Sequence, residues 1–191
     1  MVLLVDACVR DESRTRQLAE FLLENLDHTV ERICLPEVNI PELTKDALNR
    51  RMDACGRGDY SLPEFEYAKQ FALADTIVIA APYWDLSFPA ILKKYMEAIC
   101  VTGITFKYSD EGIPIGLCKA KDLYFVTTAG GPIFNRSFGF GYIEALAKGM
   151  FGISNAVMFS AENLDIIGSD VEKIMNDSKQ AIREYCQSIA G

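Results

Sequence analysis

The sequence has little of what marks zinc-binding, disulfide-stapled or nucleic-acid-binding proteins. Its 191 residues include one histidine and six cysteines, and no two cysteines form a CxxC pair. We therefore expect no metal site and no disulfide framework, and we predict reduced thiols and a cytoplasmic location. Lysine and arginine number 19 against 27 acidic residues, which gives a formal net charge of −8 and disfavours nucleic acid as a partner.

Long apolar runs are absent as well. The longest, "TIVIAAPYW" from Thr76 to Trp84, is far shorter than the roughly 20 residues that a membrane-spanning helix needs. The start of the sequence, "MVLLVDACVRDES", lacks the basic and long apolar regions of a signal peptide. We therefore expect no membrane insertion.

Short apolar runs alternate with amphipathic stretches along the chain. Five runs are strand-like, the second more weakly than the others: "VLLVDA", "HTVERICL", "DTIVIAAP", "DLYFVTTA" and "SNAVMFSAE". Helical spacing is clearest from Phe88 to Ile99 and from Val171 to Ile189. Strands that alternate with helices pair in parallel. The pattern predicts an α/β fold, a doubly wound five-stranded parallel sheet with helices on both faces.

Two segments interrupt this alternation. Residues 36–63 carry charges, two glycines and only a short helical signal, and form a lid, a dimer contact or a plain surface excursion. Residues 103–119 contain "ITFKYSDEGIPIG", which predicts a small hairpin with a turn near Asp110 to Gly112. With these two features included, we expect residues 1–191 to form a single domain.

Ligands of open parallel sheets bind beyond the carboxyl ends of the strands, where the strand order reverses. The loops after the first, third and fourth predicted strands are therefore the candidate site. The first loop contains no glycine, so the G-x-G-x-x-G fingerprint of dinucleotide-binding domains is missing.

The first loop, "ACVRDESRTRQLAEFL", leads into a predicted helix. It brings Arg10, Ser13, Arg14 and Thr15 to the helix start. Free N–H groups, the helix dipole, hydroxyls and an arginine together suit a terminal phosphate. The alternative is that Ser13 only caps the helix and the arginines are solvated.

The second loop, "APYWDL", follows the third predicted strand. Pro82 restricts the backbone where this strand ends. Tyr83 and Trp84 offer aromatic surface to a flat ring, and the N–H groups of Trp84, Asp85 and Leu86 could face its edge. The alternative is that Trp84 packs in the core.

The third loop, "TTAGGPI", has two glycines, Gly130 and Gly131, after a strand. Such glycines let the backbone approach a ligand closely, and their N–H groups could donate to it. The alternative is a simple turn. A phosphate cup, an aromatic wall and a donor-rich turn together match flavin mononucleotide (FMN), with its phosphate, ribityl chain and flat ring.

Several stretches resemble the flavodoxin-like NAD(P)H:quinone oxidoreductases, and most closely their FMN-dependent NADH-azoreductase branch. They are "ACVRDESRTRQLA", "APYWDLSFPAILKKYMEAICVTGITFKY", "TTAGG" and "FSAENLDIIGSDVEKIMNDSKQAI". The resemblance implies a flavodoxin-like fold, bound FMN, and a homodimer with active sites at the subunit interface.

By position, the resemblance also implies the cofactor-binding residues. They are Cys8, Ser13, Arg14 and Thr15, with Arg10 added for its charge, then Pro82, Tyr83, Trp84, Asp85 and Leu86, and finally Thr128, Ala129, Gly130 and Gly131. Two departures stand out. Cys8 lies where the family usually has serine, and Thr128-Ala129 where Ser-Arg is common.

The implied function is FMN-dependent NAD(P)H oxidoreduction by a ping-pong sequence. NAD(P)H gives hydride to flavin N5 and leaves, and a quinone, azo compound or similar flat acceptor takes its place. The cofactor carries this chemistry, so no catalytic side chain is required, although the backbone N–H of Asp85 could tune N5. No basic cluster marks a 2′-phosphate site; the isolated candidates are Arg50, Arg51, Arg57 and Arg136.

Other functions stay open at this point. A flavodoxin-like electron carrier would use the same loops to pass electrons to a redox protein. A flavin-free receiver module would need an acidic pocket, for which Asp6, Asp11 and Glu12 are the only candidates. A hydrolase with Cys8 as nucleophile would need a positioned base, and none is evident.

Overall fold

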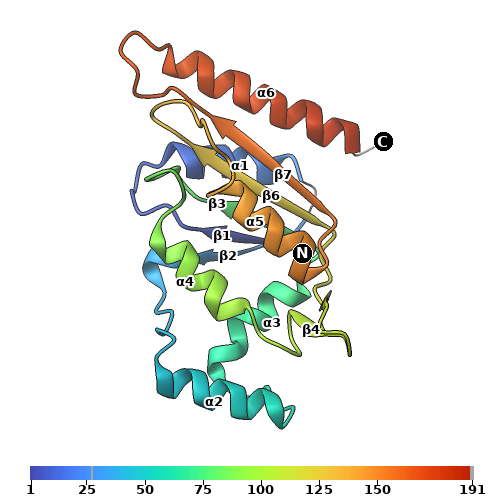
Figure 1. Cartoon of the computed structure of the whole chain (residues 1–191). Coiled ribbons are helices and arrows are strands. Elements are labelled where there is room, and N and C mark those ends of the chain that lie inside the picture. Colours follow the sequence, from blue (N-terminus) through green and yellow to red (C-terminus); the bar gives the residue numbers. More distant parts are fainter. Residues whose placement is uncertain (27, 190–191) are drawn as a thin grey trace.

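The computed structural model describes residues 1–26 and 28–189. Its centre is a five-stranded parallel sheet in the order β2-β1-β3-β6-β7 (Figure 1). The strands are β1 (Val2–Asp6), β2 (Val30–Cys34), β3 (Thr76–Ala80), β6 (Asp122–Thr128) and β7 (Asn155–Ala161). All five expected strands and their parallel pairing are confirmed.

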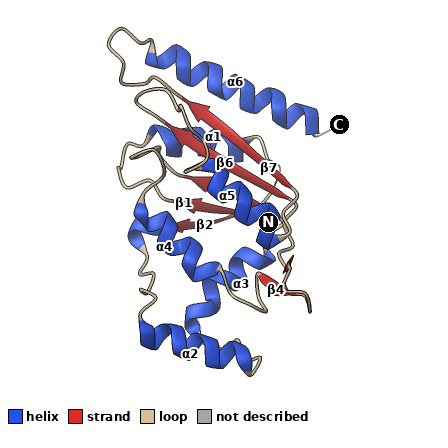
Figure 2. Cartoon of the chain, in the orientation of Figure 1, coloured by secondary structure: helices blue, strands red, loops and turns tan. Residues whose placement is uncertain are grey.

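Helices cover both faces of this sheet (Figure 2). The covering helices are α1 (Arg14–Glu24), α3 (Glu66–Leu73), α4 (Ala90–Ile99), α5 (Phe140–Leu146) and α6 (Val171–Ile189), whereas α2 (Lys45–Gly56) lies away from the sheet. One apolar core joins α3, α4 and α5 to one face of the sheet, and a second joins α1 and α6 to the other. Leu3 of β1 belongs to the first core and Leu4 to the second, because successive strand side chains point to opposite faces.

The connection from β2 to β3 holds more helix than the sequence indicates. Within residues 36–63, α2 extends over 12 residues, and a further helix, α3, precedes β3. In α2, Ala54 is the only buried residue, so the sequence of this helix shows little of the apolar periodicity by which a helix is recognised. Its start is nevertheless marked, because the side chain of Thr44 accepts a hydrogen bond from the N–H of Ala47.

The predicted hairpin is confirmed as the antiparallel pair β4 (Phe106–Tyr108) and β5 (Pro114–Gly116). It packs against a π-helical turn, Ala147–Phe151, which directly follows α5. A Cβ atom on Gly116 would lie only 2.1 Å from the backbone nitrogen of Gly152. This contact requires glycine. Among the described residues, no helix is both long and apolar enough to cross a membrane.

Candidate active site

Three loops meet at the carboxyl edge of the sheet because β1, β3 and β6 are neighbours in it. They enclose a cavity of about 950 Å³, which we call the mouth cavity. Of the residues expected to bind a cofactor, it is lined by Cys8, Arg10, Ser13, Arg14, Thr15, Pro82, Tyr83, Trp84, Thr128, Ala129 and Gly130. Asp85, Leu86 and Gly131 do not line it.

The start of α1 is built to face an anion. Ser13 is the N-cap, and its hydroxyl accepts a hydrogen bond from the N–H of Arg16 at 3.2 Å. Within the described part of the chain, the N–H groups of Arg14 and Thr15 donate to no protein oxygen. The first turn of α1 carries no acidic residue. The positive end of the helix is therefore open toward the mouth cavity.

One arginine of α1 fixes the loop that precedes the helix. The Arg16 Nε donates to Asp6 Oδ2 at 2.5 Å, and its terminal nitrogens donate to the carbonyls of Cys8, Arg10 and Asp11. The hydrogen bond to Asp6 raises the pKa of Arg16. Asp6 also accepts from the N–H of Cys8 at 2.8 Å. Asp6 is thereby occupied in holding this loop, which counts against a receiver-type acidic pocket.

The thiol of Cys8 faces the mouth cavity but is 1% exposed. Burial raises its pKa to about 12, against a smaller lowering by the hydrogen bond with Ser13. The thiol is therefore protonated at neutral pH. Since the thiolate is the nucleophilic form, this environment does not support a Cys8 nucleophile.

The aromatic loop forms a tight turn. The N–H of Trp84 donates to the carbonyl of Ser87 at 3.1 Å, and the N–H of Ser87 donates to the carbonyl of Trp84 at 2.8 Å. Asp85 and Leu86, the central residues, have left-handed φ angles of 51° and 67°, a strained conformation for leucine. Trp84 is 38% exposed and lines the mouth cavity, so the alternative that it packs in the core is wrong.

The third loop is tied to its neighbours on both sides. The hydroxyls of Thr15 and Thr128 hydrogen-bond at 2.6 Å, which joins it to the first loop. The N–H of Asp165 donates to the carbonyl of Gly130 at 2.9 Å, which joins it to the loop after β7. A Cβ atom on Gly130 would lie 2.5 Å from Asp165 Oδ2, so glycine here makes room for a carboxylate.

Sequence reasoning missed the part of the site that comes from the end of the chain. The mouth cavity is also lined by Leu164, Asp165, Val171, Glu172, Met175, Asn176 and Lys179, on α6 and the loop before it. These residues follow the fifth strand. Only the first, third and fourth strands were expected to contribute loops.

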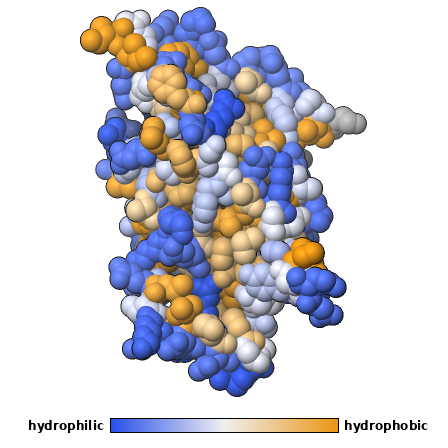
Figure 3. Space-filling model, viewed as in Figure 1, coloured by the Kyte–Doolittle hydropathy of each residue, from blue (hydrophilic) through white to orange (hydrophobic). Residues whose placement is uncertain are grey.

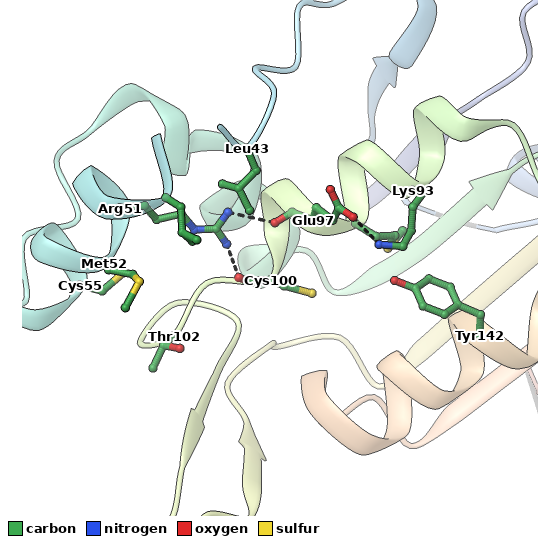
Figure 4. Close-up of a pocket in the computed structure, with 11 residues that line it drawn as sticks. Leu43, Arg51, Met52, Cys55, Lys93, Glu97, Cys100, Thr102 and Tyr142 are labelled. Atoms are coloured by element: carbon green, nitrogen blue, oxygen red, sulfur yellow. Dashed lines mark hydrogen bonds and ion pairs between the residues drawn. The ribbon is translucent and has the colours of Figure 1, made fainter. Parts of the chain in front are cut away.

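A second cavity, of about 390 Å³, lies between α2 and α4 (Figure 4). Arg51 of α2 crosses toward α4 and donates to the carbonyl of Glu97 at 3.0 Å and to that of Cys100. Burial lowers the pKa of Arg51. The neighbouring Arg50 pairs with Glu64 at 2.8 Å. Both arginines are thus engaged away from the mouth cavity, which weakens them as phosphate ligands.

Comparison with known proteins places this architecture in a family. The sequence model of the flavodoxin-like fold matches residues 1–186. The chain is 37% identical to FMN-dependent NADH:quinone oxidoreductase 2 of Clostridium acetobutylicum, with 97% of this chain and 98% of the relative covered. It is 38% identical to the FMN-dependent NADH:quinone oxidoreductase of Coprothermobacter proteolyticus, over 93% and 92%.

A solved structure has the same fold. The azoreductase from Bacillus anthracis superposes with a TM-score of 0.83 at 24% identity, covering 98% of each chain. The expected doubly wound sheet is therefore the flavodoxin-like one. On the family match and on its likeness to the quinone oxidoreductases over nearly its whole length, the chain belongs to the flavodoxin-like family.

Proposed function

We propose that the chain is an FMN-dependent NAD(P)H oxidoreductase that acts on quinones, azo compounds or similar flat acceptors. The observation that carries the proposal is the convergence of three loops on one cavity at the carboxyl edge of the sheet. Two relatives that are 37% and 38% identical to the chain over more than nine-tenths of its length are named FMN-dependent NADH:quinone oxidoreductases.

The mouth cavity fits the parts of FMN. The unpaired N–H groups of Arg14 and Thr15 and the arginine side chain suit the phosphate. Tyr83 and Trp84 offer aromatic surface for the ring. Gly130 brings backbone to the cavity edge, where N–H groups could stabilise negative charge on a reduced ring.

Bound FMN would supply the two-electron chemistry, accepting hydride from a nicotinamide and then reducing the acceptor in a ping-pong sequence. The chain's own part is to bind and orient. Arg16 holds the loop of Cys8 in place through Asp6, and the turn at Trp84 presents the aromatic wall. No side chain is assigned a proton-transfer role, since hydride transfer needs no general base.

We further propose a homodimer, with residues 36–63 contributing to its interface. Leu43, Leu48 and Met52 are 44%, 41% and 62% exposed, and all three line the second cavity. Figure 3 shows apolar side chains over the lower and central part of this face, where α2 and α4 lie. Exposed apolar surface of this kind typically marks an interaction site. A single domain over residues 1–191 and a cytoplasmic location stay predictions.

The purified chain tests the function directly. We expect a yellow protein whose flavin absorption bleaches on addition of NADH, and steady-state NADH oxidation when a small quinone is supplied. A colourless protein that cannot be reconstituted with FMN would contradict the proposal. A flavin-loaded protein that turns over no quinone would instead indicate the alternative, an electron carrier for a redox protein.

A further inference from the structure

Exposed apolar side chains lie beside the mouth cavity, and the proposed flavin site does not use them. All 11 phenylalanines of the chain are within the described residues, and the two exposed ones are Phe134 and Phe138, at 88% and 58%. Both belong to residues 129–139, which connect β6 to α5. Leu86, in the turn after β3, is 56% exposed. Apolar side chains gathered at one place on a surface mark a binding site.

Two hydrogen bonds hold residues 129–139 against the turn after β3. The Ser87 hydroxyl donates to the carbonyl of Phe138 at 2.6 Å, and the Tyr83 hydroxyl donates to the carbonyl of Asn135 at 3.5 Å. Since Tyr83 lines the mouth cavity, these bonds place the exposed side chains next to its aromatic wall. Figure 1 shows the two loops at the same edge of the sheet. We call these exposed side chains the apolar rim; they are Trp84, Leu86, Phe134 and Phe138.

The backbone at Leu86 gives a second, independent sign of a binding role. Its φ of 67° lies in the left-handed region, which glycine and asparagine tolerate and leucine does not. The strain is not offset by burial, because the side chain is more than half exposed. Strain of this kind is typically kept at sites that contact a ligand. The Leu86 side chain therefore fits a contact outside the folded monomer.

We propose that the apolar rim binds the alkyl tail of a quinone whose ring occupies the mouth cavity, so that quinones with a long apolar side chain are the preferred acceptors. The inference rests on the proposed flavin-dependent function and extends it to the class of substrate. The rim is continuous with the cavity, because Trp84 belongs to both. A tail attached to a ring at the aromatic wall thus leaves the cavity over apolar surface. Removing the equivalent of about two methylene groups from water makes binding roughly tenfold tighter.

Trp84 provides a direct measurement, since it is the one tryptophan of the chain and quinones quench indole fluorescence. The probes are two benzoquinones that differ only in carrying an ethyl or an octyl group, which leaves the reduction potential of the ring nearly the same. Quenching of Trp84 in the oxidised, FMN-loaded protein without NADH gives the Kd of each quinone. We expect the octyl quinone to bind about tenfold more tightly. Its kcat/KM with NADH should be higher by a similar factor.

Substitutions in the rim should lower this preference. Phe134→Ser and Phe138→Ser each remove a side chain that does not line the mouth cavity, and each should reduce the ratio of the two Kd values about threefold. Leu86→Asn removes an apolar side chain and suits the left-handed turn, so it should reduce the ratio without unfolding the chain. Leu73→Ser is the matched control. Leu73 is 69% exposed but ends α3, at the opposite edge of the sheet, and its substitution should keep the wild-type ratio.

Several outcomes would overturn the inference while leaving the flavin-dependent function intact. One is a wild-type protein that binds both quinones equally, and another is a ratio that all three rim substitutions leave unchanged. An equal loss in Leu73→Ser would show that the effect is not specific to the rim. If Phe134→Ser converts a dimer into monomers in sedimentation experiments, the rim is a contact between copies of the chain and not a tail site. A protein that binds no flavin, or that reduces neither quinone, overturns the proposed function itself.

Discussion

Single residues at the mouth cavity show what short-range pattern can reveal. Ser13 was expected either to cap a helix or to help bind a phosphate, and the structure shows that it caps α1. Arg16 and Asp165 were not singled out, because their roles depend on partners that the tertiary fold supplies. Asp165 meets Arg14 from 151 positions away along the chain, a contact that no local spacing encodes.

Cys8 predicts a pH dependence of stability that can be measured. Its folded-state pKa of about 12 lies above the unfolded value of 9.0. The stabilising contribution of the protonated thiol is complete below about pH 9, where both states hold the proton. It is lost as pH rises from 9 to 12, because the unfolded chain ionises first.

We expect the free energy of unfolding of the wild type to fall faster than that of Cys8→Ser over this range. The difference should reach at most about 1.4 kcal/mol per pH unit, as measured by urea unfolding at pH 8, 9, 10 and 11. Cys34→Ser, which replaces a less buried thiol, should change the slope less. Parallel curves for wild type and Cys8→Ser would contradict a buried, protonated thiol.

Helices and strands were predictable where packing on the sheet requires apolar residues at regular spacing in the sequence. The strands and α4 follow from apolar runs because packing on the sheet demands them. α2 was underestimated because it lies away from the sheet, at the foot of the molecule in Figure 1, and buries almost no surface. The eight residues of α3 are too few to show a clear helical repeat.

The attachment of α2 depends on Arg51, which donates to two carbonyls near the carboxyl end of α4. Glu97 is in the last turn of α4, whose carbonyls lack partners within the helix, and Cys100 is the residue that ends it. A cation at this end also complements the helix dipole. Arg51→Gln should therefore lower the free energy of unfolding by about 1–2 kcal/mol. It should also speed amide hydrogen exchange over residues 45–56, as followed by mass spectrometry.

The adjacent Arg50→Gln serves as the matched control. Arg50 is an exposed residue of α2 and pairs with Glu64, which lies beyond the helix. Ion pairs at the surface contribute little to the free energy of unfolding. Its exchange over residues 45–56 should match that of the wild type. Equal protection in Arg51→Gln and the wild type would mean that other contacts hold α2 to α4.

At the scale of the whole molecule, the fold was predictable because the apolar runs, their alternation with helices and the loop compositions all indicate the same architecture. Buried runs select strands, alternation with helices selects parallel pairing, and the strand order then brings the three loops together. No comparable pattern in the sequence indicates which surface of the chain would contact a second copy. It has to be inferred from apolar surface left exposed after folding.

The proposed homodimer is best tested by a substitution in α2. Met52 is 62% exposed and lines the second cavity between α2 and α4. In a two-fold symmetric dimer, one substitution alters the interface twice. Met52→Asp would put two desolvated charges into that interface, and we expect it to convert a dimer of 21.3 kDa chains into monomers in sedimentation experiments.

Ile167→Asp is the control, since Ile167 is fully exposed but belongs to the loop before α6, at the opposite end of the molecule from α2 (Figure 1). It should sediment as the wild type does. If the wild type is monomeric at every concentration, the homodimer is wrong. If Met52→Asp stays dimeric while Ile167→Asp dissociates, the interface instead includes the loop before α6, which also contributes Asp165 to the mouth cavity.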